Sequence, residues 1–564
     1  MEKSKNRNLK TNSINIVFIV PPHIQLKEYI SPSENRRHVI KPDGNTYGSL
    51  ITDMPLGPLS ISAYLKKHIA VKTSLIDFNV ELNIAESFNY LTFYDYFEDY
   101  FITNSYYDSD IFALSSLFSP SYTSLLDIAK VLRKIYSNKI IMAGGNIPST
   151  MYKQIYLDED SIDLICYGEG ELPMLEYLTA DNQDEYLSQS TSWITKKKLS
   201  DNNFKPEHNF IWNLNEIPFL DYDLCGDKYD DNPTFLNSGD HQDSELHYHI
   251  LTSRGCPFHC VFCASHKVHG RKMRYYSVDR VKNDLLCLKE NFGAKTLIFQ
   301  DDHFMGNPKR ALEIVKFIGN ELDTKFIFQN SLALYALKRE FLEAIKQAGM
   351  DQLVLSVESG SDRVLNKVMK KPLKLSIVEK VVKDCRELGI YTFCNIVMGL
   401  PGETKKDIED SRKFLKSINA NWFGFYIANP LVGSEMFEVS LDHGYLKDNW
   451  IGSDYKDAVI ETEDWTSDFI LKKVYDLNLE LNFIENSDYK LRDYQTALDG
   501  FERAINAKKD HALAYYMAAR CHDKLGDIEK AKKYLTKSKK IFSNSVLWKN
   551  HMTNFNINPI DLSL

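Results

Sequence analysis

The sequence predicts an α/β protein of several domains: a parallel sheet covered by helices, a partial (β/α)6 barrel of the TIM type, and an all-helical end. Two stretches in which short apolar strands alternate with amphipathic helices predict the first two parts. A final stretch in which only helical periodicity remains predicts the third. A chain of 564 residues is also too long for one hydrophobic core, which agrees with three or four domains.

The composition is that of a folded globular chain with no general affinity for nucleic acid. Hydrophobic residues make up 43% of the chain, and a formal net charge of −9 gives no attraction to phosphate backbones. No apolar run reaches the roughly 20 residues that a spanning helix needs, so we expect no membrane insertion. The basic start runs into an apolar strand without a cleavage pattern, so we expect residues 1–13 to be a disordered tail of a cytoplasmic protein.

Residues 14–180 are expected to form the first domain. Apolar runs such as INIVFIV and KIIMAGG alternate with helical runs such as LLDIAKVLRKIY, which is the pattern of a parallel sheet covered on both faces. Several of these strands end in small residues. Ligands bind at the carboxyl ends of such strands, where glycine lets a ligand approach the backbone. The strand-end residues are Ser115, Ser116, Gly144, Gly145, Gly168, Glu169 and Gly170.

A second alternating region over residues 246–435 follows a polar stretch, residues 181–245, which we expect to be a linker. Six strand–helix units in a row predict an open, partial barrel with its chemistry at the carboxyl ends of the strands. The six strand candidates are HYHILTS, TLIFQDD, FIFQNSLAL, QLVLSVES, YTFCNIVMG and FGFYIANP.

Helical patterns alone continue beyond the barrel. We expect a helical connector over residues 436–490 and one and a half to two tetratricopeptide-type repeats over residues 491–564, from their Ala-rich spacing and an LGD turn. So short an array needs neighbouring elements to pack against. We therefore interpret it as an interaction or stability module that offers a surface to a protein partner, and not as a substrate site.

One tight cluster of cysteines carries the strongest chemical signal. Cys256, Cys260 and Cys263 lie on the loop after the first barrel strand, whereas the other six cysteines are scattered singly and do not indicate a disulfide framework. Three thiolates suit an iron-sulfur cluster, and they leave one iron of a [4Fe-4S] cube free for a ligand that is not protein. Two alternatives stay open: buried apolar cysteines, or a zinc site completed by His266 or His269.

The Cys-x3-Cys-x2-Cys spacing, with an aromatic residue before the last cysteine and on the first loop of a six-fold strand–helix repeat, resembles the radical S-adenosylmethionine (SAM) superfamily. The resemblance implies that Cys256, Cys260 and Cys263 hold a [4Fe-4S] cluster whose open iron chelates SAM. It also implies that one electron, from a donor such as flavodoxin or ferredoxin, cleaves the SAM sulfonium and gives a 5'-deoxyadenosyl radical.

Further stretches of the barrel region resemble the SAM contacts of that family. The resemblance implies that Phe262 contacts adenine through its backbone and that the end of the second strand lies near the SAM amino group. Glu358 has an alternative as the cap of a following helix, and residues 399–403 have one as a simple turn. The residues that the resemblance brings near SAM are Phe262, Asp301, Asp302, Ser356, Glu358, Asn395 and Gly399.

The first domain resembles the Rossmann-like cobalamin-binding domain that precedes many radical SAM domains, through Pro21-Pro22, Pro55-Leu56-Gly57 and the strand-end residues named above. The resemblance implies that those strand ends contact cobalamin; the alternative is a Rossmann-like domain that has lost the corrinoid. An Asp-x-His-x-x-G match at 301–306 lies inside the barrel. After the first strand the chain reads Val20-Pro21-Pro22-His23 instead, so we expect no histidine ligand on the lower face of the cobalt.

Together the two resemblances predict a radical SAM enzyme with the cofactors [4Fe-4S], SAM and cobalamin. The leading hypothesis is hydrogen-atom abstraction from an unactivated carbon of a small-molecule or peptide substrate, followed by methylation from methylcobalamin. One alternative keeps the radical step and uses it for cyclisation or rearrangement without methyl transfer. The other is a non-catalytic zinc-binding scaffold that recruits partners through its helical tail.

Overall fold

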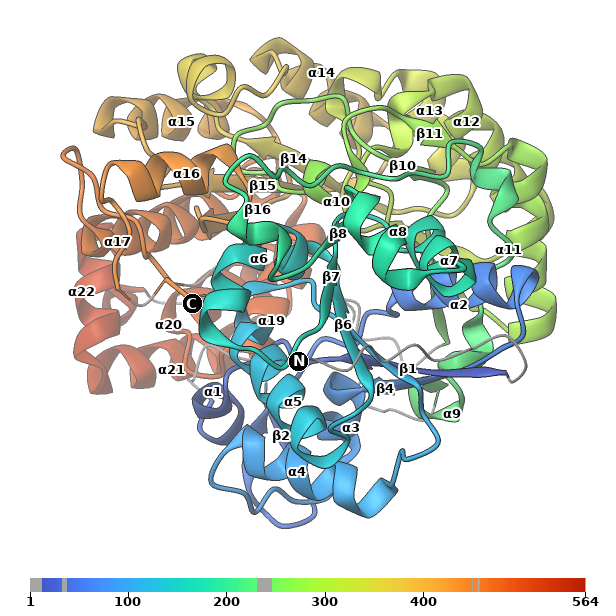
Figure 1. The fold of residues 1–564 in the computed structure, drawn as a ribbon. Coiled ribbons are helices and arrows are strands. Elements are labelled where there is room, and N and C mark those ends of the chain that lie inside the picture. Colours follow the sequence, from blue (N-terminus) through green and yellow to red (C-terminus); the bar gives the residue numbers. More distant parts are fainter. Residues whose placement is uncertain are drawn as a thin grey trace.

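The computed structural model describes residues 13–32, 38–230, 246–448, 450, 451, 453 and 457–562. The chain builds a helix-covered sheet, a curved set of parallel strands surrounded by helices, and a stack of helices that ends the chain (Figure 1). The sequence therefore predicted the fold class correctly. The tail expected over residues 1–13 lies, except for its last residue, outside the described residues.

A six-stranded sheet forms the centre of the first part, in the order β4-β1-β5-β6-β7-β8. All neighbours pair in parallel except β8, which runs antiparallel to β7 at the edge. The order reverses between β1 and β5, which is where open α/β sheets bind ligands. The strands are β1 (Ile14–Val20), β4 (Val71–Asp77), β5 (Ile111–Ser115), β6 (Ile140–Gly144), β7 (Leu164–Cys166) and β8 (Trp193–Ile194).

Alternating residues of these strands bury themselves in two separate hydrophobic cores, one on each face of the sheet. On β1, Val17 and Ile19 belong to one core and Ile16 and Phe18 to the other, as the two-residue period of a strand requires. The covering elements are α1 (Leu26–Ile30), the hairpin β2 (His38–Ile40) and β3 (Thr46–Gly48), α2 (Leu56–His68), α3 (Phe78–Ile84), α4 (Phe93–Asn104), α5 (Tyr122–Ile135), α6 (Asn146–Asp158), α7 (Glu171–Thr179) and α8 (Gln183–Gln189).

The second part contains all six expected strands, in two three-stranded parallel sheets with the orders β13-β12-β9 and β14-β15-β16. The strands are β9 (His247–Ile250), β12 (Thr296–Phe299), β13 (Lys325–Phe328), β14 (Gln352–Glu358), β15 (Tyr391–Met398) and β16 (Trp422–Ile427). The helices between them are α11 (Val278–Phe292), α12 (Pro308–Phe317), α13 (Arg339–Gln347), α14 (Leu375–Glu387) and α15 (Lys405–Ser417).

The described part of the expected linker, residues 181–230, is more structured than the sequence indicated. It contains α8, the edge strand β8 and α9 (Asp227–Asp230). Trp193 and Ile194 of β8 are fully buried, and two residues are too few to show a strand period in the sequence. Residues 231–245 lie outside the described residues.

Helices from the end of the chain cover the last barrel strand. The side-chain amide of Asn482 donates to the carbonyl of Phe423 on β16 and accepts from the N–H of Phe423, both at 2.8 Å, so it occupies the place of a neighbouring strand. Gly500 lies against the indole of Trp422, where a Cβ would be 2.8 Å from the ring. The helices are α16 (Glu435–Asp442), α17 (Ser467–Leu479), α18 (Ser487–Lys490), α19 (Tyr494–Ala507), α20 (Ala512–Lys524), α21 (Ile528–Asn544) and α22 (Val546–Asn554). None of the helices in the described ranges is long and apolar enough to cross a membrane.

Candidate functional site

A two-stranded antiparallel ribbon closes the loop that carries the three clustered cysteines. Its strands are β10 (Ser253–Arg254) and β11 (Arg274–Tyr275), and Arg254 is paired with Arg274. Gly255 begins the loop with φ = +88°, and a Cβ there would lie 2.5 Å from the carbonyl oxygen of Lys272. Only glycine fits this corner, because a side chain would meet both the strained backbone conformation and the returning strand.

The three cysteines of this loop are free, half-buried thiols. Burial raises the pKa of Cys256 and of Cys260 to about 11, and the neighbouring cysteines of the loop add to both shifts, while Lys371 lowers the pKa of Cys260. The thiols thus share one electrostatic neighbourhood. Among the described residues no group of three or more His, Cys, Asp or Glu side chains stands close enough to hold a metal ion. By donor chemistry, three soft thiols on one loop fit an iron-sulfur cluster.

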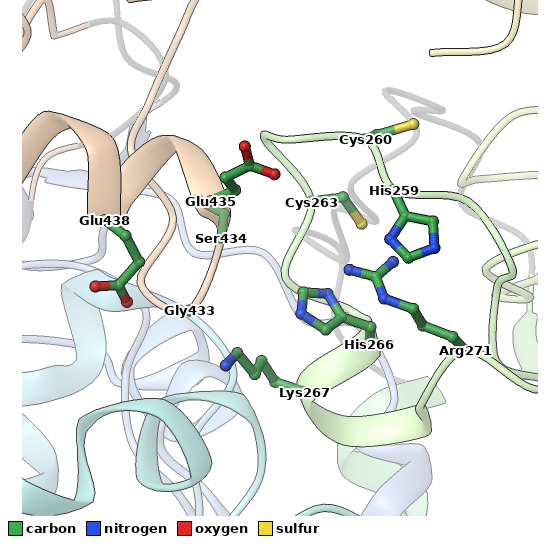
Figure 2. Close-up of a pocket in the computed structure, with 10 residues that line it drawn as sticks. All are labelled: His259, Cys260, Cys263, His266, Lys267, Arg271, Gly433, Ser434, Glu435 and Glu438. Atoms are coloured by element: carbon green, nitrogen blue, oxygen red, sulfur yellow. The ribbon is translucent and has the colours of Figure 1, made fainter. Parts of the chain in front are cut away.

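A cavity of about 250 Å³ lies beside this loop. Figure 2 shows Cys263, His266 and Arg271 pointing toward one another, while the thiol of Cys260 points away from them. Gly433 lies where a Cβ would be 2.4 Å from Thr150 of α6 and 3.1 Å from Lys267, so the barrel and the first sheet domain meet here. The lining residues are His259, Cys260, Cys263, His266, Lys267, Arg271, Gly433, Ser434, Glu435 and Glu438.

A chain of polar side chains, which the sequence did not single out, crosses the carboxyl ends of the first three barrel strands. Gln300 donates to the Oε1 of Gln329 at 2.9 Å and lies 2.8 Å from the Nδ1 of His249. Gln329 in turn donates to the carboxylate of Asp53, a residue of the first domain. His249 is fully buried, and burial lowers its pKa against the opposing effect of Asp53, so the imidazole is neutral.

Two of the residues expected near SAM present buried oxygens with no partner in the described part of the chain. They are Oδ2 of Asp302, after β12, and Oδ1 of Asn395, on β15. Burial raises the pKa of Asp302. Buried polar atoms without a partner are uncommon in folded proteins, and a bound ligand is one explanation for them.

The other residues expected near SAM either bond to groups of the protein itself or are half-buried. The carboxylate of Asp301 accepts from the backbone and hydroxyl of Thr252 and from the hydroxyl of Ser253, so it ties the segment after β12 to the start of β10 and the residue before it. Glu358 has φ = +66° and accepts from Lys371 at 3.0 Å. The N–H of Gly399 donates to Glu403 at 2.7 Å within the expected turn. Ser356 and Phe262 are half-buried.

The strand ends expected to contact cobalamin come together at one edge of the first sheet. The hydroxyls of Ser116 and Ser121 are 2.6 Å apart. Gly145 has φ = +95°, and a Cβ there would lie 2.6 Å from the carbonyl oxygen of Ser116. Ser115 and Gly144 are half-buried neighbours of these residues, paired across β5 and β6.

The stretch from Gly168 to Gly170 faces protein. A Cβ on Gly168 would lie 2.7 Å from the ring of His208 and 3.2 Å from the carbonyl oxygen of Val268 in the cysteine loop, and one on Gly170 would meet Ile61. The carboxylate of Glu169 bonds Arg254 and Arg274 at the two ends of that loop and His269 within it. Burial alone would raise the pKa of Glu169, but the positive groups around it hold that pKa well below its usual range.

Comparison with known protein families identifies the parts of the chain. The radical SAM superfamily matches residues 250–415, the B12 binding domain matches residues 52–178, and the tetratricopeptide repeat matches residues 489–550. The first match contains the cysteine loop, the last residue of β9 and the four barrel strands from β12 to β15. The second contains the strand ends expected to contact cobalamin.

Several relatives of this chain carry methyltransferase names. An uncharacterized methyltransferase of Pyrococcus horikoshii is 29% identical over 375 residues, which are 65% of this chain and 78% of the relative. The cytidylyl-2-hydroxyethylphosphonate methyltransferase of Streptomyces wedmorensis is 24% identical over 409 residues, which are 66% of this chain and 75% of the relative.

Solved structures share the fold. The cobalamin-dependent SAM radical enzyme OxsB with aqua-cobalamin bound aligns with a TM-score of 0.59 and 16% identity over 98% of this chain and 81% of that one. The methyltransferase TsrM from Kitasatospora setae aligns with a TM-score of 0.54 and 13% identity over 77% and 76% of the two chains. The family matches thus give this chain a B12 binding domain, a radical SAM domain and a tetratricopeptide repeat, in that order.

Proposed function

We propose that this chain is a cobalamin-dependent radical SAM methyltransferase that methylates an unactivated carbon of a small-molecule or peptide substrate. The observation that carries the proposal is the loop of three free thiols, which lies at the barrel mouth and contacts the end of β7 in the B12 binding domain. The methyltransferase names of both relatives support methyl transfer over cyclisation or rearrangement. The radical SAM match favours a cluster over zinc in the loop.

Cys256, Cys260 and Cys263 would hold the [4Fe-4S] cluster of this domain. When bound, cluster, SAM and cobalamin together supply the electron, the radical and the methyl group that no side chain provides. The protein's own contribution is to bind and orient. Asp302 and Asn395 offer buried oxygens that accept hydrogen bonds from a ligand at the barrel mouth, and Phe262, Ser356, Glu358 and Gly399 belong to the same proposed SAM site. Asp301 would act one step away, through Thr252 and Ser253.

Ser116 and Gly145 would line the cobalamin side of the active site, together with Ser115 and Gly144. Their strands end at the edge of the sheet where its order reverses, which supports a ligand there. The polar chain from His249 to Asp53 would then face the substrate between the two domains. A neutral His249 can donate from Nε2 while its Nδ1 accepts from Gln300. The polar chain therefore suits a substrate with a hydrogen-bonding group near the carbon that reacts.

We also propose an external electron donor, a cytoplasmic location and a protein partner. Reductive cleavage of SAM needs an electron from a donor such as reduced flavodoxin or ferredoxin. Nine free cysteines suit the reducing cytoplasm. The tetratricopeptide match supports a protein partner at the tail helices.

Anaerobic reconstitution with iron, sulfide and hydroxocobalamin tests the proposal. We expect bound iron, bound corrinoid and release of 5'-deoxyadenosine from SAM. Alanine at any one of the three loop cysteines should abolish that release, whereas Cys287→Ala, which removes a half-buried thiol elsewhere, should leave iron content and release unchanged. Wild-type release from a loop variant would refute the proposed site, and a product without an added methyl group would refute methyl transfer.

A further inference from the structure

One carboxylate of the B12 binding domain clamps both ends of the cysteine loop. Glu169 lies 3.0 Å from the Nη1 of Arg254 before the loop, and it accepts from Arg274 at 2.5 and 2.8 Å after the loop. His269, inside the loop, bonds the same carboxylate at 2.7 Å. Because Arg254 and Arg274 face each other across the ribbon that closes the loop, this one group fixes the base of the loop.

The clamp is buried and its charges balance. Arg254, Arg274 and Glu169 are between 3% and 5% exposed, and so is Glu171, which accepts from the other guanidinium nitrogen of Arg254 at 2.7 Å. The hydroxyl of Ser60 completes this group by contacting both Arg254 and Glu171. Two arginines thus stand against two glutamates. A buried charge that loses its partner is costly, so removal of one glutamate leaves an uncompensated positive charge at the base of the loop.

We propose that Glu169 is a positioning residue for the iron-sulfur site, so that the B12 binding domain completes the site that its partner domain carries. The inference rests on the proposed function, because it takes Cys256, Cys260 and Cys263 as cluster ligands. Arg254 precedes Cys256 by two residues, so the clamp sets where the first ligand begins. The same buried charges set the local potential, because the net charge around a cluster shifts its reduction potential.

The test uses the reconstituted full-length protein with Glu169→Gln and Glu169→Asp. Glu169→Gln keeps the shape and removes the charge, so we expect a several-fold loss of bound iron after gel filtration, an altered EPR signal of the reduced cluster, and a more positive midpoint potential. Glu169→Asp keeps the charge and shortens the reach, so its potential should return toward wild type even where iron retention stays low. A role confined to general stability would not separate these two readouts.

Glu480→Gln is the matched control. Glu480 also bonds two basic side chains, Arg412 and Lys416, but it lies in the helices that follow the barrel. We expect it to leave iron, EPR signal and potential unchanged. A folded Glu169→Gln protein with wild-type values of all three overturns the inference. If Glu169→Gln does not fold, Glu171→Gln decides, because it also frees Arg254 of one negative partner: a positive shift supports the inference and an unchanged potential overturns it. A wild-type protein without a cluster would instead refute the proposed function.

Discussion

Gly255→Ala should cost this protein its cluster while leaving the fold in place. In the structure the new Cβ would lie 2.5 Å from the carbonyl oxygen of Lys272 and 3.2 Å from that of His269. The first contact must open by about 0.9 Å to reach the 3.4 Å of an ordinary van der Waals contact. Metal sites hold ligand distances within about 0.2 Å, so a shift of this size at the start of the loop displaces Cys256 from any shared centre. The positive φ adds roughly 1–2 kcal/mol of backbone strain.

The assay is iron and sulfide content per chain after anaerobic reconstitution, with thermal unfolding as the check on the fold. Gly526→Ala is the control, because Gly526 also has a positive φ, of +84°, but a Cβ there would meet nothing within 4 Å. Both variants introduce a similar backbone strain, but only Gly255→Ala should bind several-fold less iron per chain. A Gly255→Ala protein with wild-type iron content would show that the ribbon does not determine the geometry of the loop.

Three further predictions follow from the site. Burial raises the pKa of Glu403 from 4.5 to about 7; the stability it contributes is therefore full below about pH 4.5 and is lost as the pH rises through 7. The test compares denaturant unfolding of wild type and Glu403→Gln, followed by Trp465, whose indole N–H donates to the backbone carbonyl of Glu403. Over that pH range the free energy of unfolding of wild type should fall by about 3 kcal/mol relative to the variant. A constant difference would contradict this. Asn395→Ala should weaken SAM binding to the reconstituted protein about tenfold, the equivalent of one hydrogen bond of roughly 1.4 kcal/mol, in equilibrium dialysis; unchanged affinity would remove Asn395 from the SAM site. Gly145→Ala should lose bound corrinoid, since its Cβ would press on Ser116, whereas Gly44→Ala, at an open positive-φ turn of the same domain, should retain it; equal corrinoid content would count against this sheet edge as the binding site.

The sequence predicted the parts of the fold that depend on local periodicity. The six barrel strands, and β1 and β6 of the first sheet, were each marked by an apolar run of strand length, and the structure contains all of them. The sequence did not predict β8 or the hairpin of β2 and β3, because the pairing of such short strands depends on the elements around them and leaves no periodic pattern in the sequence.

The candidate site divides in the same way. Cys256, Cys260 and Cys263 lie on one loop, so their spacing alone indicated them. Glu169 stood in a glycine-rich turn at a strand end, a pattern that indicates a ligand contact, yet its carboxylate bonds arginines more than 80 positions later in the chain. The polar chain from His249 to Asp53 was missed for the same reason, since its members come from separate strands and from another domain. As cofactor contacts, the predicted residues remain predictions.

The side chain of Asn482 has a consequence for how this protein tolerates truncation. It pairs with both backbone polar groups of Phe423 on the last barrel strand, and the helices behind it pack against the half-buried indole of Trp422. An uncovered outer strand is a template for pairing with another molecule. A chain that is cut before Asn482 would therefore expose the unpaired backbone edge of β16 and aggregate, even with every cluster ligand still present.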